Sequence, residues 1–193
     1  MRTRMPPKRR WGYSDDFQTP PEAVVPLVPY LKAKGIRVVW ECAAGKGNLV
    51  RALRAFGFKV IATDIIYDPK QNFLTYEPDE PWDAIVTNPP YSLRYEFIKR
   101  AYELGKPWAM LMTLTTLEGK RQRLFEKYGI ELLLLDRRIN FEVPDGMGRS
   151  GAWFLSVWFC WKILPKPICF GKVPKYFSVP LKEREENDRP DTG

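Results

Sequence analysis

The feature that most constrains the fold is an apolar run of strand length that leads into a glycine-containing turn and then into a helix. The run covers residues 37–42 (RVVWEC), and the turn covers residues 43–47 (AAGKG). From Asn48 onward, apolar side chains recur at the spacing of one helix face, and Gly57 is placed to cap the helix. A strand, a tight turn and a helix in this order are typical of folds in which parallel strands alternate with helices.

Further apolar runs of strand length follow at residues 59–63, 82–87, 108–112, 131–136 and 152–161. Helical patterns separate the earlier runs, as far as residue 128. The last two runs are joined by the polar segment 137–151, which leaves no room for a long helix. The pattern predicts an α/β fold with a mostly parallel sheet and an antiparallel strand pair at one side. Ligands of such sheets bind at the carboxyl ends of the strands.

Length and composition restrict the class of protein. A chain of 193 residues is long enough for one buried core, to which we assign residues 14–164, with a basic tail at 1–13 and a C-terminal extension and polar tail at 165–193. The sequence contains no histidine, and its three cysteines show no metal-ligand spacing, so we expect neither a metal site nor a disulfide framework. No apolar stretch approaches the roughly 18 residues of a membrane span, and we expect a soluble, cytoplasmic protein.

The charge of the chain favours a polyanionic partner. The formal net charge is +8 and the sequence pI is about 9.4. Five of the first ten residues are Lys or Arg. Because such side chains displace counterions from nucleic-acid phosphates, a nucleic acid is the expected partner.

The first group of candidate site residues is the glycine turn together with an acidic residue at the end of the next strand. Gly45 and Gly47 let the backbone pass close to a ligand just before a helix begins. The third glycine of a dinucleotide fingerprint would fall at Val50, which disfavours a pyrophosphate. Asp64 follows the second strand, where a carboxylate accepts hydrogen bonds from a ribose. These residues favour an adenosine ligand; the alternative is a tight turn with Asp64 as a helix cap.

The second group, Asn88-Pro89-Pro90-Tyr91, directly follows a buried strand and is more specific. Pro90 forces Pro89 into an extended conformation, so the Asn88 side chain and the Pro89 carbonyl are held in a rigid bend. Each of these two oxygens can accept a hydrogen from one amino group, which makes its nitrogen nucleophilic. Tyr91 provides a ring on which a planar base can stack. The alternative is a proline-rich turn with a core tyrosine.

These motifs resemble those of the class I S-adenosylmethionine-dependent methyltransferases that modify amino groups of DNA bases, over residues 14–161. The family signature is an Asp or Asn followed by Pro-Pro and an aromatic residue, downstream of a glycine-rich motif. Residues 17–20 (FQTP) resemble its N-terminal cofactor motif, and residues 72–74 (NFL) resemble the segment that holds the cofactor adenine. The family usually has Asp where this chain has Asn72. Phe141 resembles the aromatic residue that packs against an extruded base.

The resemblance implies a Rossmann-like methyltransferase fold with a seven-stranded sheet, and S-adenosylmethionine as the methyl donor. The residues that it assigns to donor binding are Thr19, Pro20, Glu41, Cys42, Ala43, Gly45, Gly47, Asn48, Asp64, Ile65, Asn72 and Phe73. It assigns catalysis to Asn88, Pro89, Pro90 and Tyr91, and stacking of the substrate base to Tyr91 and Phe141.

The order of the motifs is similar to that of N6-adenine methyltransferases, which implies DNA, favoured over RNA, as the acceptor. Members that read a defined sequence carry a separate target-recognition domain, whereas about thirty residues remain after Trp161. A separate specificity subunit would supply that function. Short members of this kind resemble enzymes carried by phages.

Three other functions stay open from the sequence. An RNA adenine methyltransferase fits the same chemistry and charge. A glutamine methyltransferase of the release-factor type also uses Asn-Pro-Pro-Tyr, but it resembles a longer chain. A noncatalytic nucleic-acid-binding module is the third, and the intact Asn88 and Tyr91 argue against it.

Overall fold

The computed structural model describes residues 18–141 and 155–177. Several predictions lie outside these residues: the basic tail (1–13), the role of Phe17, most of the 137–151 segment and the polar tail after residue 177.

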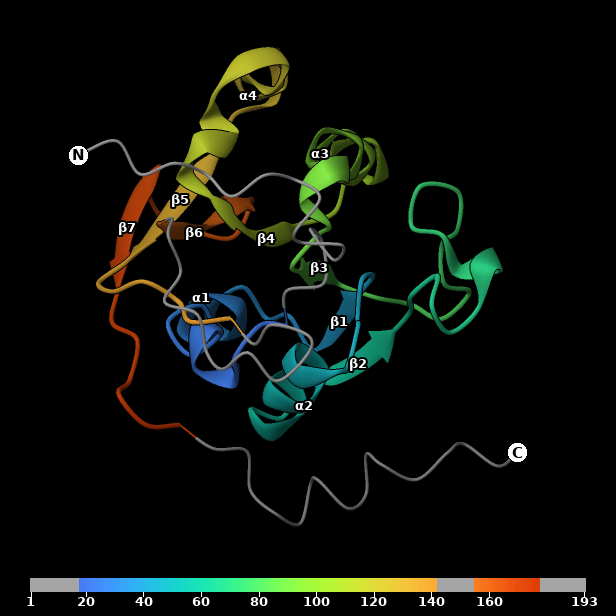
Figure 1. The fold of residues 1–193 in the computed structure, drawn as a ribbon, viewed down its shortest axis with the longest axis horizontal. Coiled ribbons are helices and arrows are strands. Elements are labelled where there is room, and N and C mark those ends of the chain that lie inside the picture. The colour runs from blue at the N-terminus through green and yellow to red at the C-terminus, as the bar shows by residue number, and fades with distance from the viewer. Residues whose placement is uncertain (1–17, 142–154, 178–193) are drawn as a thin grey trace, which may run out of the picture.

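Seven strands form one sheet in the order β2-β1-β3-β4-β6-β5-β7 (Figure 1). The strands are β1 (Val38–Glu41), β2 (Lys59–Ala62), β3 (Ala84–Thr87), β4 (Trp108–Thr113), β5 (Glu131–Leu135), β6 (Ser156–Trp161) and β7 (Ile168–Gly171). Strands β1 to β4 pair in parallel, whereas β6 pairs antiparallel with both β4 and β5. The predicted α/β fold, with a mostly parallel sheet and an antiparallel pair, is confirmed.

The position of β6 sets the direction of β5 relative to β4. Because β6 is inserted between β4 and β5, strand β5 runs in the same direction as β4. Strand β7 pairs in parallel with β5 and forms the edge of the sheet. The sequence patterns did not indicate β7, which lies within residues 165–193, the predicted C-terminal extension and polar tail.

Helices cover both faces of the sheet. In Figure 1, α1 (Val28–Ala33) and α2 (Asn48–Ala55) lie on one face, and α3 (Arg94–Leu104) and α4 (Gln122–Tyr128) lie on the other. Side chains alternate along β1, so Val39 packs in the cluster under α1 and α2 while Trp40 packs in the cluster under α3. No helix among the described residues is long and apolar enough to cross a membrane.

The sequence patterns predict a short helix that begins at residues 19–21 and another helix over residues 117–128, and both are shorter in the structure. The first pattern resolves into the 3-10 turn η2 (Pro21–Ala23) and then α1, which has proline in its first turn. The predicted helix at 117–128 becomes α-helical only at Gln122, because Glu118 is extended (φ −88°, ψ 159°) and a 3-10 turn, η6 (Gly119–Arg121), follows it.

Candidate active site

The carboxyl ends of three neighbouring strands bring the predicted site residues to one edge of the sheet. Strand β1 ends at Glu41, β2 leads through Thr63 to Asp64, and β3 ends at Thr87, just before Asn88. Since β1 lies between β2 and β3, the glycine turn that follows β1 is flanked by Asp64 on one side and by Asn88 on the other.

The glycine turn has a backbone that favours glycine at two positions. Gly45 and Gly47 have φ values of +51° and +76°, in the left-handed region. A Cβ at Gly45 would lie 2.9 Å from Nε2 of Gln18. The same glutamine accepts a hydrogen bond from the Lys46 N–H at 2.9 Å, so the segment before η2 closes over the turn.

Asp64 holds the glycine turn through its own carboxylate. Its Oδ2 accepts a hydrogen bond from the Gly45 N–H at 2.9 Å, and its Oδ1 accepts one from the Ile66 N–H at 3.0 Å. The turn-capping alternative therefore has a structural basis. Each carboxylate oxygen accepts more than one hydrogen bond, so Asp64 still has acceptor capacity for a ribose.

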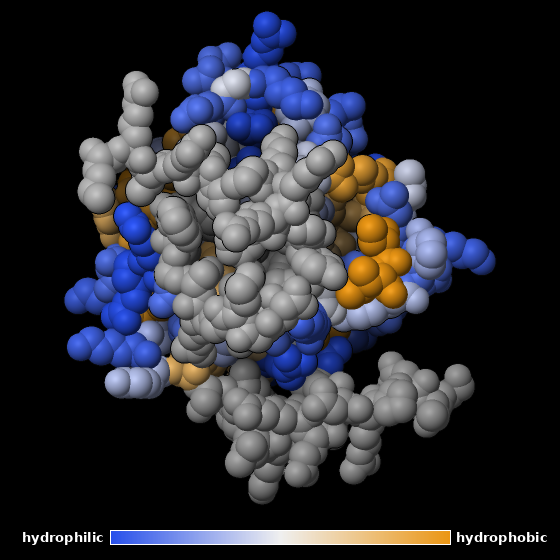
Figure 2. Space-filling model, viewed as in Figure 1, coloured by the Kyte–Doolittle hydropathy of each residue, from blue (hydrophilic) through white to orange (hydrophobic). Residues whose placement is uncertain are grey.

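Apolar side chains follow Asp64 directly and face solvent. Ile65 is 56% exposed and Ile66 is 68% exposed. The visible face of the molecule carries a group of hydrophobic side chains on its right, where the chain after β2 runs in Figure 1 (Figure 2). Ile65 and Ile66 thus form an exposed apolar surface directly after Asp64, and the adenosine contact predicted for Ile65 stays a prediction.

Glu41 connects the glycine turn to the strand that leads to Asn88. Its side chain is buried, and its Oε1 accepts a hydrogen bond from the Ala43 N–H at 3.0 Å and another from the Thr87 hydroxyl. Burial raises the pKa of Glu41 to about 8, although both hydrogen bonds lower it. Its neighbour Cys42 is also buried, and burial raises the pKa of that thiol. Glu41 is therefore mostly a neutral carboxylic acid near pH 7.

Four further residues assigned to the donor are buried or hydrogen-bonded in the structure. Phe73 is 1% exposed and packs against Trp40 and Phe97, with ring centroids 5.2 and 4.6 Å away. The Asn72 side chain accepts a hydrogen bond from the Leu74 N–H at 3.1 Å. The Asn48 side chain accepts a hydrogen bond from Arg51, and Thr19 is buried. The donor contacts of these residues stay predictions, as does that of Pro20.

Phe141 lies in the core. Its ring is 2% exposed and belongs to the apolar cluster that also contains Val24 and Trp158. A ring buried to this extent presents no face to a substrate base in this conformation. The burial of Phe141 therefore gives no support to its predicted stacking on a substrate base.

Comparisons with known proteins give one local sequence match and one informative structural likeness. No family model matches the chain. An alanine/serine racemase of Pyrococcus horikoshii is 47% identical over 51 residues, but the match spans 26% of this chain and 9% of the racemase. It describes a short segment and assigns no activity to the chain.

A proposed RNA methyltransferase of Pyrococcus horikoshii superposes with a TM-score of 0.53 at 18% identity, over 75% of this chain and 84% of that one. The chain has a Rossmann-like methyltransferase fold. The modification subunit of a proposed type I restriction enzyme from Vibrio vulnificus covers 92% of this chain and 52% of its own, with 13% identity and a TM-score of 0.45.

Within this methyltransferase fold, the structure adds Arg94 to the predicted site. Its Nε donates to the Tyr91 carbonyl at 2.9 Å, and its Nη1 donates to the hydroxyls of Thr113 at 2.7 Å and Thr116 at 3.2 Å. The guanidinium also lies 5.3 Å from the centre of the Tyr91 ring. Arg94 thus ties the bend after β3 to the end of β4. Its place three residues after Tyr91 is the one sequence signal for this role.

Proposed function

We propose that the chain transfers a methyl group from S-adenosylmethionine to an exocyclic amino nitrogen, with adenine N6 in DNA as the favoured acceptor. The observation that carries this proposal is the pair of hydrogen bonds accepted by Glu41. One comes from the glycine turn and the other from Thr87, so the donor-binding turn and the Asn88 bend are linked through one buried side chain.

The residues around the glycine turn fit an adenosine-containing donor. Gly45 and Gly47 add no side chains of their own to the turn, Asp64 offers acceptors for ribose hydroxyls, and Ile65 offers an apolar surface for the adenine. When bound, S-adenosylmethionine would supply a methyl group on a sulfonium; the S–CH3 bond breaks as the N–CH3 bond forms, and because the sulfur departs as a neutral thioether, no acid is needed.

The Asn88 bend fits the acceptor. Strand β3 stops at Thr87 because Pro89 and Pro90 cannot continue it, and this places Asn88 at the carboxyl edge. The Asn88 amide oxygen and the Pro89 carbonyl each accept a hydrogen of the amine and align its lone pair with the methyl group. The chain contributes orientation and exclusion of water, and the proton of the product leaves to solvent.

The proposal is tested by incubating the protein with methyl-labelled S-adenosylmethionine and, separately, single-stranded DNA, duplex DNA, RNA and total protein. Nucleosides from the labelled acceptor are then separated. We expect label in N6-methyldeoxyadenosine. Label in N6-methyladenosine would assign RNA as the acceptor, label in a glutamine side chain would assign a protein, and no label in any acceptor would contradict methyl transfer.

A further inference from the structure

The edge strand β7 and the residues around it carry exposed basic and aromatic side chains that the proposed reaction does not use. Residues 162–177 contain four lysines and no acidic residue. Phe170 is 77% exposed and Tyr176 is 93% exposed. We call six exposed residues of this segment the basic–aromatic strip; they are Lys166, Ile168, Phe170, Lys172, Lys175 and Tyr176.

The alternation along β7 places part of the strip on one face of the sheet. Ile168 and Phe170 are exposed, whereas Cys169 and Val173 are buried on the opposite face. Ile168 lies in register with Leu132 on β5, and Phe170 with Leu134. Both leucines pack against the cluster that contains Phe125 of α4. The aromatic ring of Phe170 is therefore on the face of the sheet that α4 covers.

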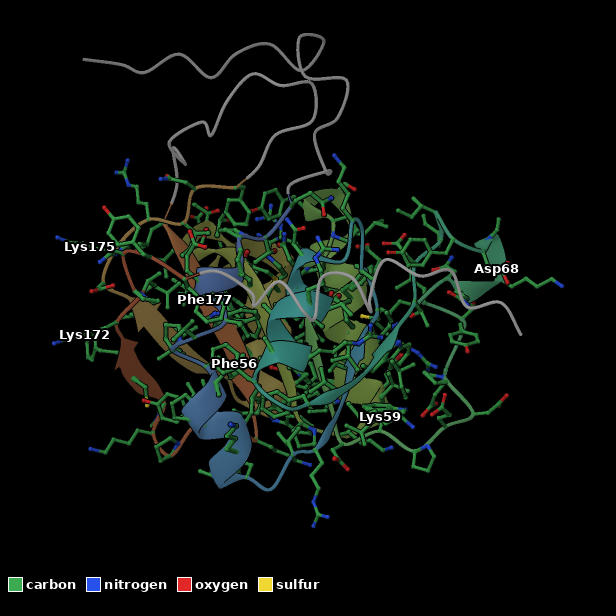
Figure 3. The ribbon with its side chains drawn as sticks, turned by 90° about the horizontal axis from the view of Figure 1, so that it is seen from below. Phe56, Lys59, Asp68, Lys172, Lys175 and Phe177 are labelled. Atoms are coloured by element: carbon green, nitrogen blue, oxygen red, sulfur yellow. The ribbon has the colours of Figure 1, made fainter. Side chains whose placement is uncertain are left out.

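Hydrogen bonds and a ring contact of neighbouring residues hold the strip in place. The Val173 N–H donates to Oδ1 of Asp136 at 2.9 Å, and the Asp136 N–H donates to the Gly171 carbonyl at 3.0 Å. Farther along, Phe177 stacks on Phe56 at the end of α2, with ring centroids 5.2 Å apart and planes 10° apart (Figure 3). An anchored strand can present Phe170 with little loss of conformational entropy on binding.

The charges of the strip favour an anionic partner. Among the described residues, Lys166, Lys172 and Lys175 make no ion pair, while the ion pairs that do form involve other basic residues. Figure 3 shows Lys172 and Lys175 projecting from the same side of the molecule, opposite to Asp68. Lysines that alternate with exposed rings match the phosphates and bases of one unpaired strand.

We infer that the basic–aromatic strip binds single-stranded nucleic acid, with bases on Phe170 and Tyr176 and phosphates at the lysines. The inference rests on the proposed function in that the bound strand would be the methyl acceptor. Strand β7 runs in the same direction as β3, β4 and β5. Lys172 and Lys175 follow the carboxyl end of β7, so they lie at the same end of the strands as Asn88. A strand bound there can extend toward the acceptor site.

The test is fluorescence anisotropy of the full chain with a labelled 20-nucleotide single strand and the matching duplex, without any methyl donor. Phe170→Leu should weaken single-strand binding about five-fold or more, whereas Phe170→Tyr should bind like the wild type. The double variant Lys172→Gln/Lys175→Gln should lower the slope of log Kd against log salt by about 1.4.

The matched control is Lys32→Gln/Lys34→Gln, which removes the same charge from two exposed lysines. These lysines lie where α1 leads into β1, at the amino edge of the sheet, so single-strand affinity should change little. The inference is overturned if both lysine pairs lower affinity equally, or if Phe170→Leu binds like the wild type. It is also overturned if light scattering shows a dimer that Phe170→Leu converts to a monomer, because the strip would then be an interface between copies. This binding assay contains no methyl donor, so it does not depend on methyl transfer. If the strip binds single strands but the protein methylates no acceptor, only the proposed function is contradicted.

Discussion

At the scale of the residue, substitution of Asn88 should affect catalysis and leave donor binding intact. If its amide oxygen polarises the amine mainly in the transition state, Asn88→Ala should lower kcat by about 10² or more, the scale for one oriented polar contact. The affinity for S-adenosylmethionine should change little, because the glycine turn and Asp64 are untouched. Single-turnover rates and calorimetric binding of the donor measure the two effects. Near-normal turnover at saturating substrate would show that the motif does not activate the amine.

The burial of Phe141 gives a second expectation for a single residue. A ring that is 2% exposed in an apolar cluster leaves a cavity when it is removed. Phe141→Ala should therefore lower the free energy of unfolding by about 3 to 5 kcal/mol, and Phe141→Leu should lower it less. Urea denaturation measures both variants. If Phe141→Ala has the same free energy of unfolding as the wild type and only its affinity for nucleic acid falls, the ring stacks on the substrate base.

At the scale of elements, Glu41 joins the ends of β1 and β3, and its protonation links their packing to pH. Its pKa in the folded chain, about 8, lies above the ordinary value of 4.5, so the folded state holds the proton more tightly. The resulting stabilisation is complete below pH 4.5 and is lost as the pH rises through 8. For this fully buried group the loss is on the order of a few kcal/mol.

Glu41→Gln should remove this part of the pH dependence, because an amide keeps an oxygen for Ala43 and Thr87 but does not titrate. Urea denaturation of the wild type and the variant at pH 5, 7 and 9 measures it. The wild type should lose stability relative to the variant as the pH rises. Parallel pH profiles for the two proteins would show that Glu41 is ionised in the folded chain at neutral pH.

Arg94 joins the start of α3 to the bend at Tyr91 and to the end of β4. A lysine has one compact head group and cannot reach the Tyr91 carbonyl and the threonine hydroxyls together. We therefore expect Arg94→Lys to lower kcat about ten-fold or more, since a small displacement of the acceptor is costly, with donor affinity unchanged. Lys99→Ala on the same helix, which breaks only an exposed ion pair, is the control. Equal activity of both variants would limit Arg94 to a structural role.

At the scale of the whole molecule, the charge of +8 should appear as a salt dependence. Binding of nucleic acid should weaken steeply between low and physiological salt, and deleting residues 1–10 should lower affinity broadly across sequences. Two of the basic side chains make contacts within the protein itself: Arg121 donates a hydrogen bond to the Thr116 carbonyl at 2.7 Å, and Lys120 lies over the Tyr95 ring. Titrations at several salt concentrations measure the slope. A salt-independent affinity would indicate a peptide or small-molecule acceptor instead.

Patterns of neighbouring residues were enough to predict most of the elements. The apolar runs predicted β1 to β6, and Gly45 and Gly47 were predicted to form a turn before a helix; both have positive φ, and α2 follows them. The prolines after Asn88 ended β3 as expected. Each of these features depends on residues within a few positions of one another, so periodicity and steric restriction suffice to predict them.

Contacts between distant segments were decided only by the tertiary structure. Glu41 and Thr87 are 46 residues apart, and only the adjacency of β1 and β3 brings them together. The same holds for Arg94 with Thr113, and for β7, a strand of four residues that is stabilised by its pairing with β5. Phe141 resembled a residue that faces a substrate base, yet its ring lies in the core. The sequence shows that this side chain is apolar and aromatic, so it can either stack on a base or pack in the core. Which of the two it does depends on the order of the strands in the sheet.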